Sequence, residues 1–475
     1  MPPRRRAARL SSRPYSSAAA AEQWPRGWLA VRHNRPSKRA RRVPTKIAQG
    51  DEDGTPLTDE ILVGIFAGLP DFSDLIRCAA TCRRWCRLVS GEAAFICRAA
   101  RRRPRGPSSL LCSLALGFFY SHCHGAVPRF APTASASRRL GLRQPSLNAL
   151  VEGLDDGLFD ASRLITSRNG LLVVELQHRE RERALKLCVC NPMTGEVTVL
   201  PPLGGKQIVS PFACAVLTAD DYSNDDDSHA SDPPSSPSSS YYVLLLYGRR
   251  GFMACRTYAS DGGRWGPEAK VGNAVRLGKK AMASMAGTAV AVRNKVVYWH
   301  AKSILFGLRL DTLQAEHVDM PMSGHDPAGN TLVGVSPDGR LRVVRVIEPH
   351  SLVTRKKRVA ICVVNRSATG DEWEPRDEVI EVVGRFLPAE TTWIKLRWIC
   401  EKSGVVFFTA GCDDQRSDVY AMSLDKQEAE KVASHHGGSG GGGGSDSSPS
   451  WENLVGYEMD RTSYLSSLAM DDDDP

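Results

Sequence analysis

Cysteine and histidine side chains could bind a metal ion in this chain, but their spacing does not bring four ligands together. Cys78, Cys82 and Cys86 follow one another at intervals of four residues, which places the three thiols on one face of a helix, where cysteine commonly serves as a small apolar core residue. The side chains of the adjacent His, Cys and His at 122–124 should point in different directions, because neighbouring residues do. The Cys-x-Cys motif at 188–190 has no second pair of cysteines at the spacing that zinc ligands require. We therefore expect no metal ion and no other cofactor.

Motifs that would indicate an enzyme are also missing. The glycine-containing stretch 272–279 has the wrong spacing for a phosphate-binding loop, and no Ser or Thr follows Lys279. The His-Glu-x-x-His pattern of zinc proteases does not occur. These observations predict a protein that performs no catalysis of its own.

Positive charge is concentrated at the start of the chain. The 475 residues carry a formal net charge of +9, whereas residues 1–50 alone hold 13 Lys and Arg against the single acid Glu22, a net of +12. The remainder holds 49 basic and 52 acidic residues, a net of −3. The basic character therefore belongs to an arm, and we expect residues 1–54 to be disordered.

Within this arm, Lys38, Arg39, Arg41 and Arg42 form a compact basic run of the kind that acts as a nuclear import signal. The arm is also rich in Arg and Ser and poor in acids, as organelle transit peptides are. A secretory signal is missing, and so is a membrane-spanning run of about 18 or more apolar residues. We expect a soluble protein of the nucleus and/or cytoplasm with reduced thiols and no membrane contact; an organelle transit peptide is the alternative.

The elements that follow the arm begin with a stretch, 57–95, that predicts two or three short helices. Thr58 can cap the first helix, Gly68 ends it, and Ser73 can cap the second. Apolar residues form one stripe in each run: Ile61, Leu62, Ile65, Phe66 and Leu69 in the first, and Leu75, Ile76, Ala79, Cys82, Trp85, Cys86 and Val89 in the second. A unit of about 40 residues cannot bury all of this surface by itself, so a partner chain should cover part of it.

The same stretch resembles an F-box. The matching positions are Leu57-Thr58-Asp59-Glu60, Leu69-Pro70, Asp74-Leu75-Ile76, Thr81-Cys82-Arg83-Arg84-Trp85 and Phe95, with Thr58 and Thr81 in place of the usual Pro and Val. The resemblance implies that the segment binds a Skp-family adaptor and, through it, the cullin of a ubiquitin ligase. The expected adaptor-binding residues, some of which must instead hold the helices together, are Leu57, Ile61, Ile65, Leu69, Pro70, Leu75, Cys82 and Trp85.

Farther along, short β-branched and aromatic runs separated by turn residues indicate strands. No long amphipathic helix interrupts these runs, which excludes a βαβ fold. The turns repeat: Asn191, Asp311 and Asp425 are each followed by Glu five residues later, and Trp265 and Trp373 each precede a Pro by two residues. A unit that recurs about every 40 to 60 residues predicts a β-propeller.

A propeller must close its ring, and the segment 451–468 is the candidate for the closing strand. A pair of β-sandwiches is the alternative architecture. The run Cys190-Asn191-Pro192-Met193-Thr194-Gly195-Glu196, followed by Leu200-Pro201-Pro202, resembles the F-box-associated, propeller-like domains of plant F-box proteins. That resemblance implies a domain whose loops bind a target protein.

Together these patterns predict an α+β multidomain fold, in which a small all-α F-box domain is followed by an all-β, propeller-like domain. The expected boundaries are an arm at 1–54, the F-box at 55–103, a linker and packing segment at 104–160, and the propeller-like domain at 161–470. Disordered inserts are expected at 220–240 and 435–450, because their Ser, Asp, Pro and Gly content cannot pack.

The function implied by the resemblance is that of a substrate-recognition subunit of an SCF-type (Skp-cullin-F-box) ubiquitin ligase, with a target protein of unknown identity. The alternative is a nucleic-acid-associated regulator that uses the basic arm. The arm has few aromatics beyond Trp24 and Trp28, and the propeller region adds no basic stripe to the sequence, which disfavours nucleic acid. A third hypothesis is an F-box protein that binds the adaptor outside any ligase.

Overall fold

The computed structural model describes residues 57–69, 72–102, 114–121, 126–140, 146–150, 157–160, 162–176, 184–204, 211–218, 221, 240–273, 277–302, 304–321, 330–336, 339–347, 359–367, 372–375, 378–413, 416–434 and 451–468. The expected arm at 1–54, with Lys38, Arg39, Arg41 and Arg42, lies outside these residues. So do Pro70, residues 122–124 and the insert at 435–450.

The first described part of the chain is a helical domain of four short helices: α1 (Asp59–Ala67), α2 (Phe72–Ala79), α3 (Arg83–Gly91) and α4 (Ala93–Arg102). Thr58 stands at the N-cap of α1, but its side chain makes no capping hydrogen bond. Asp59 and Glu60 favour the start of this helix because their charges lie at the positive end of its dipole. Ser73 does not cap α2, since it lies inside that helix and is buried.

Beyond the helical domain, the described strands form six sheets, which are the blades of a propeller. From the innermost strand outward, the first blade contains β24 (Val455–Glu458), β1 (Ala115–Tyr120) and β2 (Arg129–Pro132), and the second β3 (Arg163–Arg168), β4 (Leu171–Leu176), β5 (Lys186–Asn191) and β6 (Glu196–Val199). The third contains β7 (Phe212–Thr218), β8 (Tyr241–Gly248) and β9 (Met253–Ala259), with β10 (Arg264–Trp265) and β11 (Ala269–Lys270) both paired to β9.

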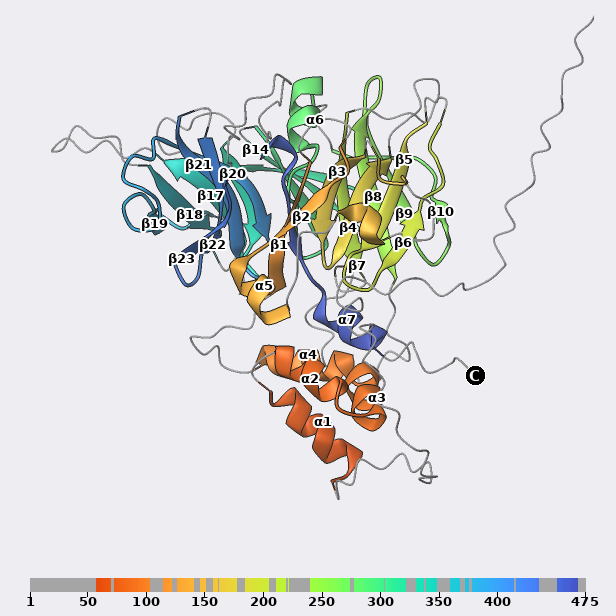
Figure 1. The fold of residues 1–475 in the computed structure, drawn as a ribbon. Coiled ribbons are helices and arrows are strands. Elements are labelled where there is room, and N and C mark those ends of the chain that lie inside the picture. Colours follow the sequence, from red (N-terminus) through yellow and green to blue (C-terminus); the bar gives the residue numbers. More distant parts are fainter. Residues whose placement is uncertain are drawn as a thin grey trace, which may run out of the picture.

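The other three blades each have four antiparallel strands. The fourth contains β12 (Ala291–Arg293), β13 (Val296–Ala301), β14 (Ile304–Arg309) and β15 (Ala315–Asp319), and the fifth β16 (Thr331–Val335), β17 (Leu341–Ile347), β18 (Ala360–Asn365) and β19 (Glu378–Glu381). The sixth contains β20 (Trp393–Cys400), β21 (Val405–Asp413), β22 (Arg416–Ser423) and β23 (Glu428–Ala433). Three helices accompany the blades: α5 (Ala134–Leu140), α6 (Lys279–Met285) and α7 (Arg461–Ser467). The expected α+β organisation and the propeller are confirmed (Figure 1).

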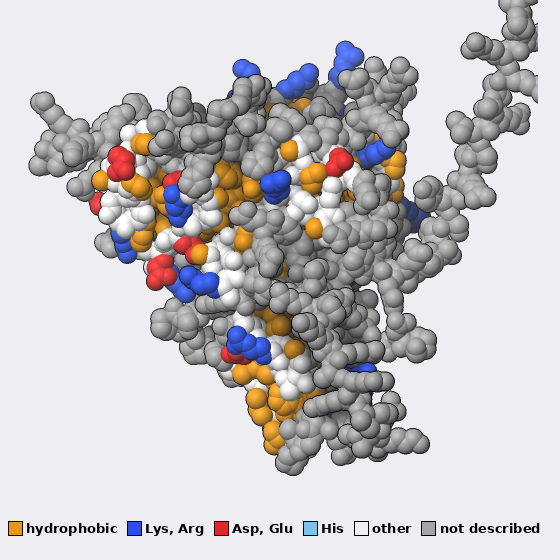
Figure 2. Space-filling view, in the orientation of Figure 1, with side chains coloured by type: hydrophobic (Ala, Val, Ile, Leu, Met, Phe, Trp, Pro, Cys, Tyr) orange, Lys and Arg blue, Asp and Glu red, His pale blue; other side chains and the backbone are white. Residues whose placement is uncertain are grey.

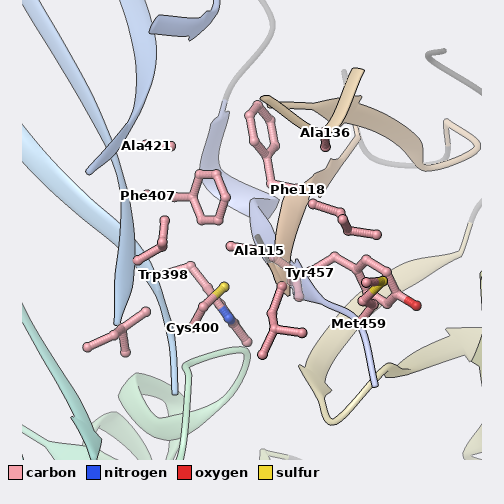
Figure 3. Packing of buried hydrophobic residues seen from close by; sticks show 14 of the residues in the cluster. Ala115, Phe118, Ala136, Trp398, Cys400, Phe407, Ala421, Tyr457 and Met459 are labelled. Atoms are coloured by element: carbon pink, nitrogen blue, oxygen red, sulfur yellow. The ribbon is translucent and has the colours of Figure 1, made fainter. Parts of the chain in front are cut away.

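The ring closes through β24, which comes from the predicted closing segment and pairs with β1. Gly456 of this strand lies against Trp398 and Phe407, so close that a Cβ at this position would overlap both rings. Figure 3 shows the packing, in which Phe118 of β1 and Phe407 of β21 meet with ring centroids 5.7 Å apart. Because β1 and β2 complete this blade, the propeller starts at Ala115 rather than at residue 161, and the segment expected to be a linker supplies two of its strands.

The inner strands end together at one pole of the propeller, the proximal pole, which faces the helical domain. The backbone N–H of Gly170, just after β3, donates to the carbonyl of Glu458 at the end of β24 (2.9 Å), and α7 follows directly. Because strands alternate in direction within each blade, turns between the second and third strands lie at the opposite, distal pole. Figure 1 shows α6 at that distal pole, far from the helical domain.

A buried ionic network joins several blades at the proximal pole. Arg168 at the end of β3 donates to both carboxylate oxygens of Asp221 (2.5 and 2.7 Å) and to Glu401 Oε2 (2.6 Å). Glu401 Oε1 accepts from the backbone N–H of Val292 in β12 (2.9 Å). Asp221 lies in the segment expected to be a disordered insert; it is packed instead, because Arg168 compensates its buried charge.

The repeated turns predicted from sequence all join the third strand of a blade to the fourth. Asn191 ends β5, Asp311 and Asp425 lie between β14 and β15 and between β22 and β23, and the two tryptophans occupy the same position in the third and fifth blades. The indole N–H of Trp265 donates to the carbonyl of Pro201 (2.8 Å), and that of Trp373 donates to the carbonyl of Asp319 (2.8 Å). In both cases the acceptor follows or ends the outer strand of the preceding blade, so these turns bind neighbouring blades together.

Candidate functional site

Helix α1 is apolar on two faces, and among the described residues one of these faces packs inside the helical domain. Leu62 and Phe66 point inward and are 2% and 1% exposed, with Phe66 meeting the ring of Trp85 edge-on at 5.3 Å. Ile61 and Ile65, one residue earlier in each case, are 50% and 47% exposed. They share the other face because they are one helical turn apart, and α1 thus presents an uncovered apolar strip to solvent.

Exposed large hydrophobic side chains are concentrated in this domain. Among the described residues, six such side chains are exposed; four belong to the stretch 57–95, and the other two, Val199 and Val379, lie in outer strands of the propeller. The four are Leu57, Ile61, Ile65 and Phe95. Figure 2 shows hydrophobic side chains gathered over α1 at the tip of the helical domain. Contiguous exposed apolar surface of this kind marks a protein interaction site.

The predicted adaptor-binding residues fall into two groups. Leu57, Ile61 and Ile65 are exposed on the outer side of α1 and form what we call the α1 strip. Leu75 is 6% exposed and belongs to the interior of the helical domain, while Leu69 and Trp85 are half-buried against that interior. Cys82 is half-buried and caps α3, its sulfur accepting from the backbone N–H of Trp85 (3.5 Å). The structure thus separates exposed residues from those that hold the helices together.

One residue that sequence reasoning did not assign holds the α1 strip in place. Arg84 of α3 donates from Nε to Asp59 Oδ1 (2.9 Å) and from Nη2 to the carbonyl of Leu57 (2.7 Å). These bonds fix the segment that precedes α1 against α3, and with it the position of Leu57. Arg84 lies inside the Cys-x-x-Trp element of the F-box pattern. Its partners are 25 and 27 residues away in the sequence, so only the fold reveals them.

The opposite side of the helical domain is covered by α7, which packs on α3 and α4. Tyr464 of α7 lies 5.8 Å from the ring of Phe72, and the guanidinium of Arg461 lies over the same ring at 5.4 Å. The thiol of Cys86 donates to the carbonyl of Leu468 (3.4 Å). Burial raises the pKa of Tyr464 to about 12. In Figure 1, α7 lies between the propeller and the helices, so α1 faces away from the propeller.

The cysteines considered as metal ligands have other surroundings. Cys78, Cys82 and Cys86 are half-buried free thiols of the helical domain. Cys188 and Cys190 are buried in β5, and burial raises the pKa of the Cys188 thiol to about 12. Within the part of the chain that the structure describes, no three His, Cys, Asp or Glu side chains come together as a metal site. None of the described helices has the length and hydrophobicity that crossing a bilayer requires.

Comparisons with known protein families find matches in two parts of the chain. Residues 59–96 match the F-box-like family, and residues 129–359, from β2 to the residue before β18, match a domain of unknown function (DUF7595). Among curated proteins no sequence matches the chain significantly.

Solved structures resemble the chain only weakly. The GH93 α-L-arabinofuranosidase of Fusarium graminearum with arabinobiose is 10% identical, with a TM-score of 0.30, over 57% of this chain and 79% of that one. The β-propeller domain of the Trilobed protease from Pyrococcus furiosus is 8% identical, with a TM-score of 0.28, over 57% and 85%. TolB from Acinetobacter baumannii is 9% identical, with a TM-score of 0.25, over 71% and 81%. Likeness this low carries no argument about activity.

The family match therefore coincides with the helices whose outer apolar strip is uncovered, and the blades follow it in the chain. This protein contains an F-box-like domain at residues 59–96 followed by a six-bladed β-propeller.

Proposed function

We propose that the chain is the substrate-recognition subunit of an SCF-type ubiquitin ligase. The α1 strip binds a Skp-family adaptor, which connects the chain to a cullin, and the propeller binds the target protein. The observation that carries this proposal is the exposure of Leu57, Ile61 and Ile65 on a helix whose other apolar face is fully packed. A helix that buries one apolar face inside its own domain and leaves another in water is built to be completed by a partner.

The size of the strip suits a stable interface. Fully burying one large aliphatic side chain contributes about 1.5 to 3 kcal/mol, so half-exposed Ile61 and Ile65 retain about half of that for a partner. Together with Leu57, and with Phe95 of α4, they can provide the central contacts that dominate an interface, before the costs of association are counted.

In this function the chain performs no bond-making step. A ubiquitin-conjugating enzyme recruited through the cullin would supply the chemistry, and the chain would raise the effective concentration of the target beside it. The geometry agrees with this division of labour, because α1 lies at the end of the helical domain farthest from the propeller (Figure 1).

The experiment is co-purification with a recombinant Skp-family adaptor. Ile61→Asp with Ile65→Asp places two charges on the α1 strip without removing any buried side chain, so we expect a folded protein that no longer retains the adaptor. The matched control is Val199→Asp with Val379→Asp, which changes two propeller side chains of similar exposure, 52% and 48%. Normal adaptor binding by the folded α1 variant would refute the proposal.

A further inference from the structure

The distal pole of the propeller carries exposed basic side chains from separate parts of the sequence. Arg250 lies in the turn between β8 and β9, Lys302 in the turn between β13 and β14, and Lys279 and Lys280 at the start of α6. All four are exposed, and none forms an ion pair with a described residue. We call these four residues the distal basic surface.

Helix α6 lies at the same pole as both basic turns. It packs on β7, β8 and β13, so it covers the junction between the third and fourth blades, whose strands β8 and β13 lead into those turns. Met282 and Met285 anchor it, at 2% and 1% exposure, in the apolar cluster of these two blades, while Lys279 and Lys280 remain outside. Figure 2 shows Lys and Arg side chains along the edge of the molecule where α6 lies.

Acidic side chains near this surface do not neutralise it. Glu268 is already paired with Arg249 (2.5 Å), whose guanidinium also lies 5.0 Å from the ring centre of Tyr247. Asp319 lies opposite Ile304 in the ladder, beside the turn of Lys302, but makes no ion pair with it. Counting Arg249 and Lys270, which lies opposite Ala254 at the start of β9, the described residues here thus include six basic and two acidic side chains, a net of +4.

We infer that the distal basic surface binds an Asp- and Glu-rich segment of a target protein. This inference rests on the proposed function, in which the propeller takes the target at a place the adaptor does not occupy. The charges are carried mainly by Lys, as point charges spread over three elements, which suits carboxylates distributed along a peptide. A site for a single phosphate would instead contain arginines whose guanidinium groups converge on it, or several backbone N–H groups that point at it.

Nucleic acid is the competing occupant of such a surface, and its chemistry fits less well. Recognition of single strands combines positive charge with exposed aromatic rings on which bases stack. Among the described residues of the two basic turns and α6, the aromatic one is Phe252, which is half-buried and packs against the core of the second and third blades.

The test uses the full chain bound to the adaptor and a fluorescent Glu/Asp-rich peptide, with the Gln/Asn version of the same peptide as the neutral probe. Fluorescence anisotropy should show binding of the acidic peptide only, weakening as salt is added. Lys279→Glu with Lys280→Glu and Lys302→Glu should lower the affinity about tenfold, because three favourable exposed charges become repulsive.

The control reverses three positive charges elsewhere: Arg264→Glu at the start of β10, and Lys295→Glu and Lys426→Glu in turns, all at the other ends of the strands. Lys295 and Lys302 are both left-handed, with φ of 61° and 60°, so the two triple variants carry the same backbone strain. The control variant should bind the peptide as the unmodified chain does.

Three outcomes would overturn the inference: no binding of the acidic peptide, an equal loss in both variants, or tighter binding of a single-stranded RNA of equal charge. Retention of the adaptor is measured on the same proteins. A chain that binds the adaptor but not the peptide refutes only this inference, whereas a chain that does not bind the adaptor refutes the proposed function.

Discussion

Arg168 and Glu401 join the second and sixth blades through a 2.6 Å hydrogen bond from Nε to Oε2, at the pole where the inner strands end. Both side chains are almost completely buried, and Arg168 also pairs with Asp221. Replacing the arginine would leave two buried carboxylates without the guanidinium that pairs with both of them. The network therefore holds together blades that are distant in sequence.

Arg168→Met should lower the free energy of unfolding by about 3 to 5 kcal/mol, the usual cost of breaking a buried ion pair on one side. Urea denaturation at neutral pH measures it. Arg163→Met is the control, because Arg163 pairs with Glu175 at the surface, where its side chain is 44% exposed, and should cost about 1 kcal/mol or less. Similar losses in the two variants would contradict a structural role for the network.

The same network makes stability depend on pH. Burial alone would raise the pKa of Asp221, but the guanidinium of Arg168 and the backbone N–H of Thr218 outweigh it and hold the pKa below its ordinary value. The stabilisation is present above the unfolded-state pKa of about 3.9 and is lost as pH falls through the lower folded-state pKa. Urea unfolding at decreasing pH should show that the difference in free energy of unfolding between the unmodified chain and Arg168→Met becomes smaller below about pH 4. A difference that does not change with pH would contradict this assignment.

Tyr464→Ala with Leu465→Ala should loosen the F-box without unfolding the propeller, because both side chains are buried in α7, which packs on the helical domain, where Tyr464 meets Phe72. Each truncation removes about 2 to 5 kcal/mol of packing at this junction. Hydrogen exchange should become faster in α3 and α4 and stay unchanged in the inner strands. Ser466→Ala, on the same helix and half-buried, should change neither.

Trp265→Phe and Trp373→Phe each remove one indole N–H that binds the preceding blade. Each should lower the free energy of unfolding by about 1 kcal/mol, the net worth of a hydrogen bond. The two turns belong to different blades, so the double variant should show the sum of the two losses. A double variant with a much larger loss would mean that the two contacts are coupled through the ring.

Gly456→Ala should weaken ring closure, since a Cβ there would overlap the rings of Trp398 and Phe407. Forcing extra volume into a packed core costs about 1 to 3 kcal/mol. Thermal unfolding measures the effect. Gly248→Ala, at the end of β8 with open space around it, should leave the melting temperature unchanged.

Sequence periodicity located the helices of the F-box but could not tell which of their apolar residues are buried and which are exposed. One stripe in the sequence contained Ile61, Leu62, Ile65 and Phe66. In the structure Leu62 and Phe66 are buried, whereas the two isoleucines are exposed. A stripe wide enough to span two faces shows that a helix is apolar, but which face meets the chain's own core depends on the other helices. The Arg84 contacts and the α7 packing depend on the fold in the same way.

The repeated turns were found by residue type, and the structure shows that backbone conformation is what repeats. Gly195, Leu313 and Gln427 are left-handed at equivalent places, with φ of 81°, 54° and 50°. Asn191 pairs with Glu196 at the end of its ladder, whereas Asp311 lies inside its turn. The sequence markers were therefore two residues out of register, although the turns they indicated are equivalent.

Long-range pairs explain the other differences. Asp221 belongs by composition to a polar insert, but it packs because it pairs with Arg168, 53 residues away, and also accepts from the nearby Thr218. The first blade combines strands from opposite ends of the described chain, so the short strands β1 and β2 gave no repeat signal before β24. The four distal basic residues are likewise scattered in sequence, and α6 and the blade turns place them at one pole.

Strand β24 and helix α7 are separated by two residues, and they come after the other described helices and strands in chain order. During translation the first blade therefore lacks its inner strand, and the F-box lacks the cover on its α3 and α4 side, until this segment has left the ribosome. The first blade and the F-box therefore complete their packing at the same stage of synthesis. A product cut short before residue 451 would lack both β24 and α7.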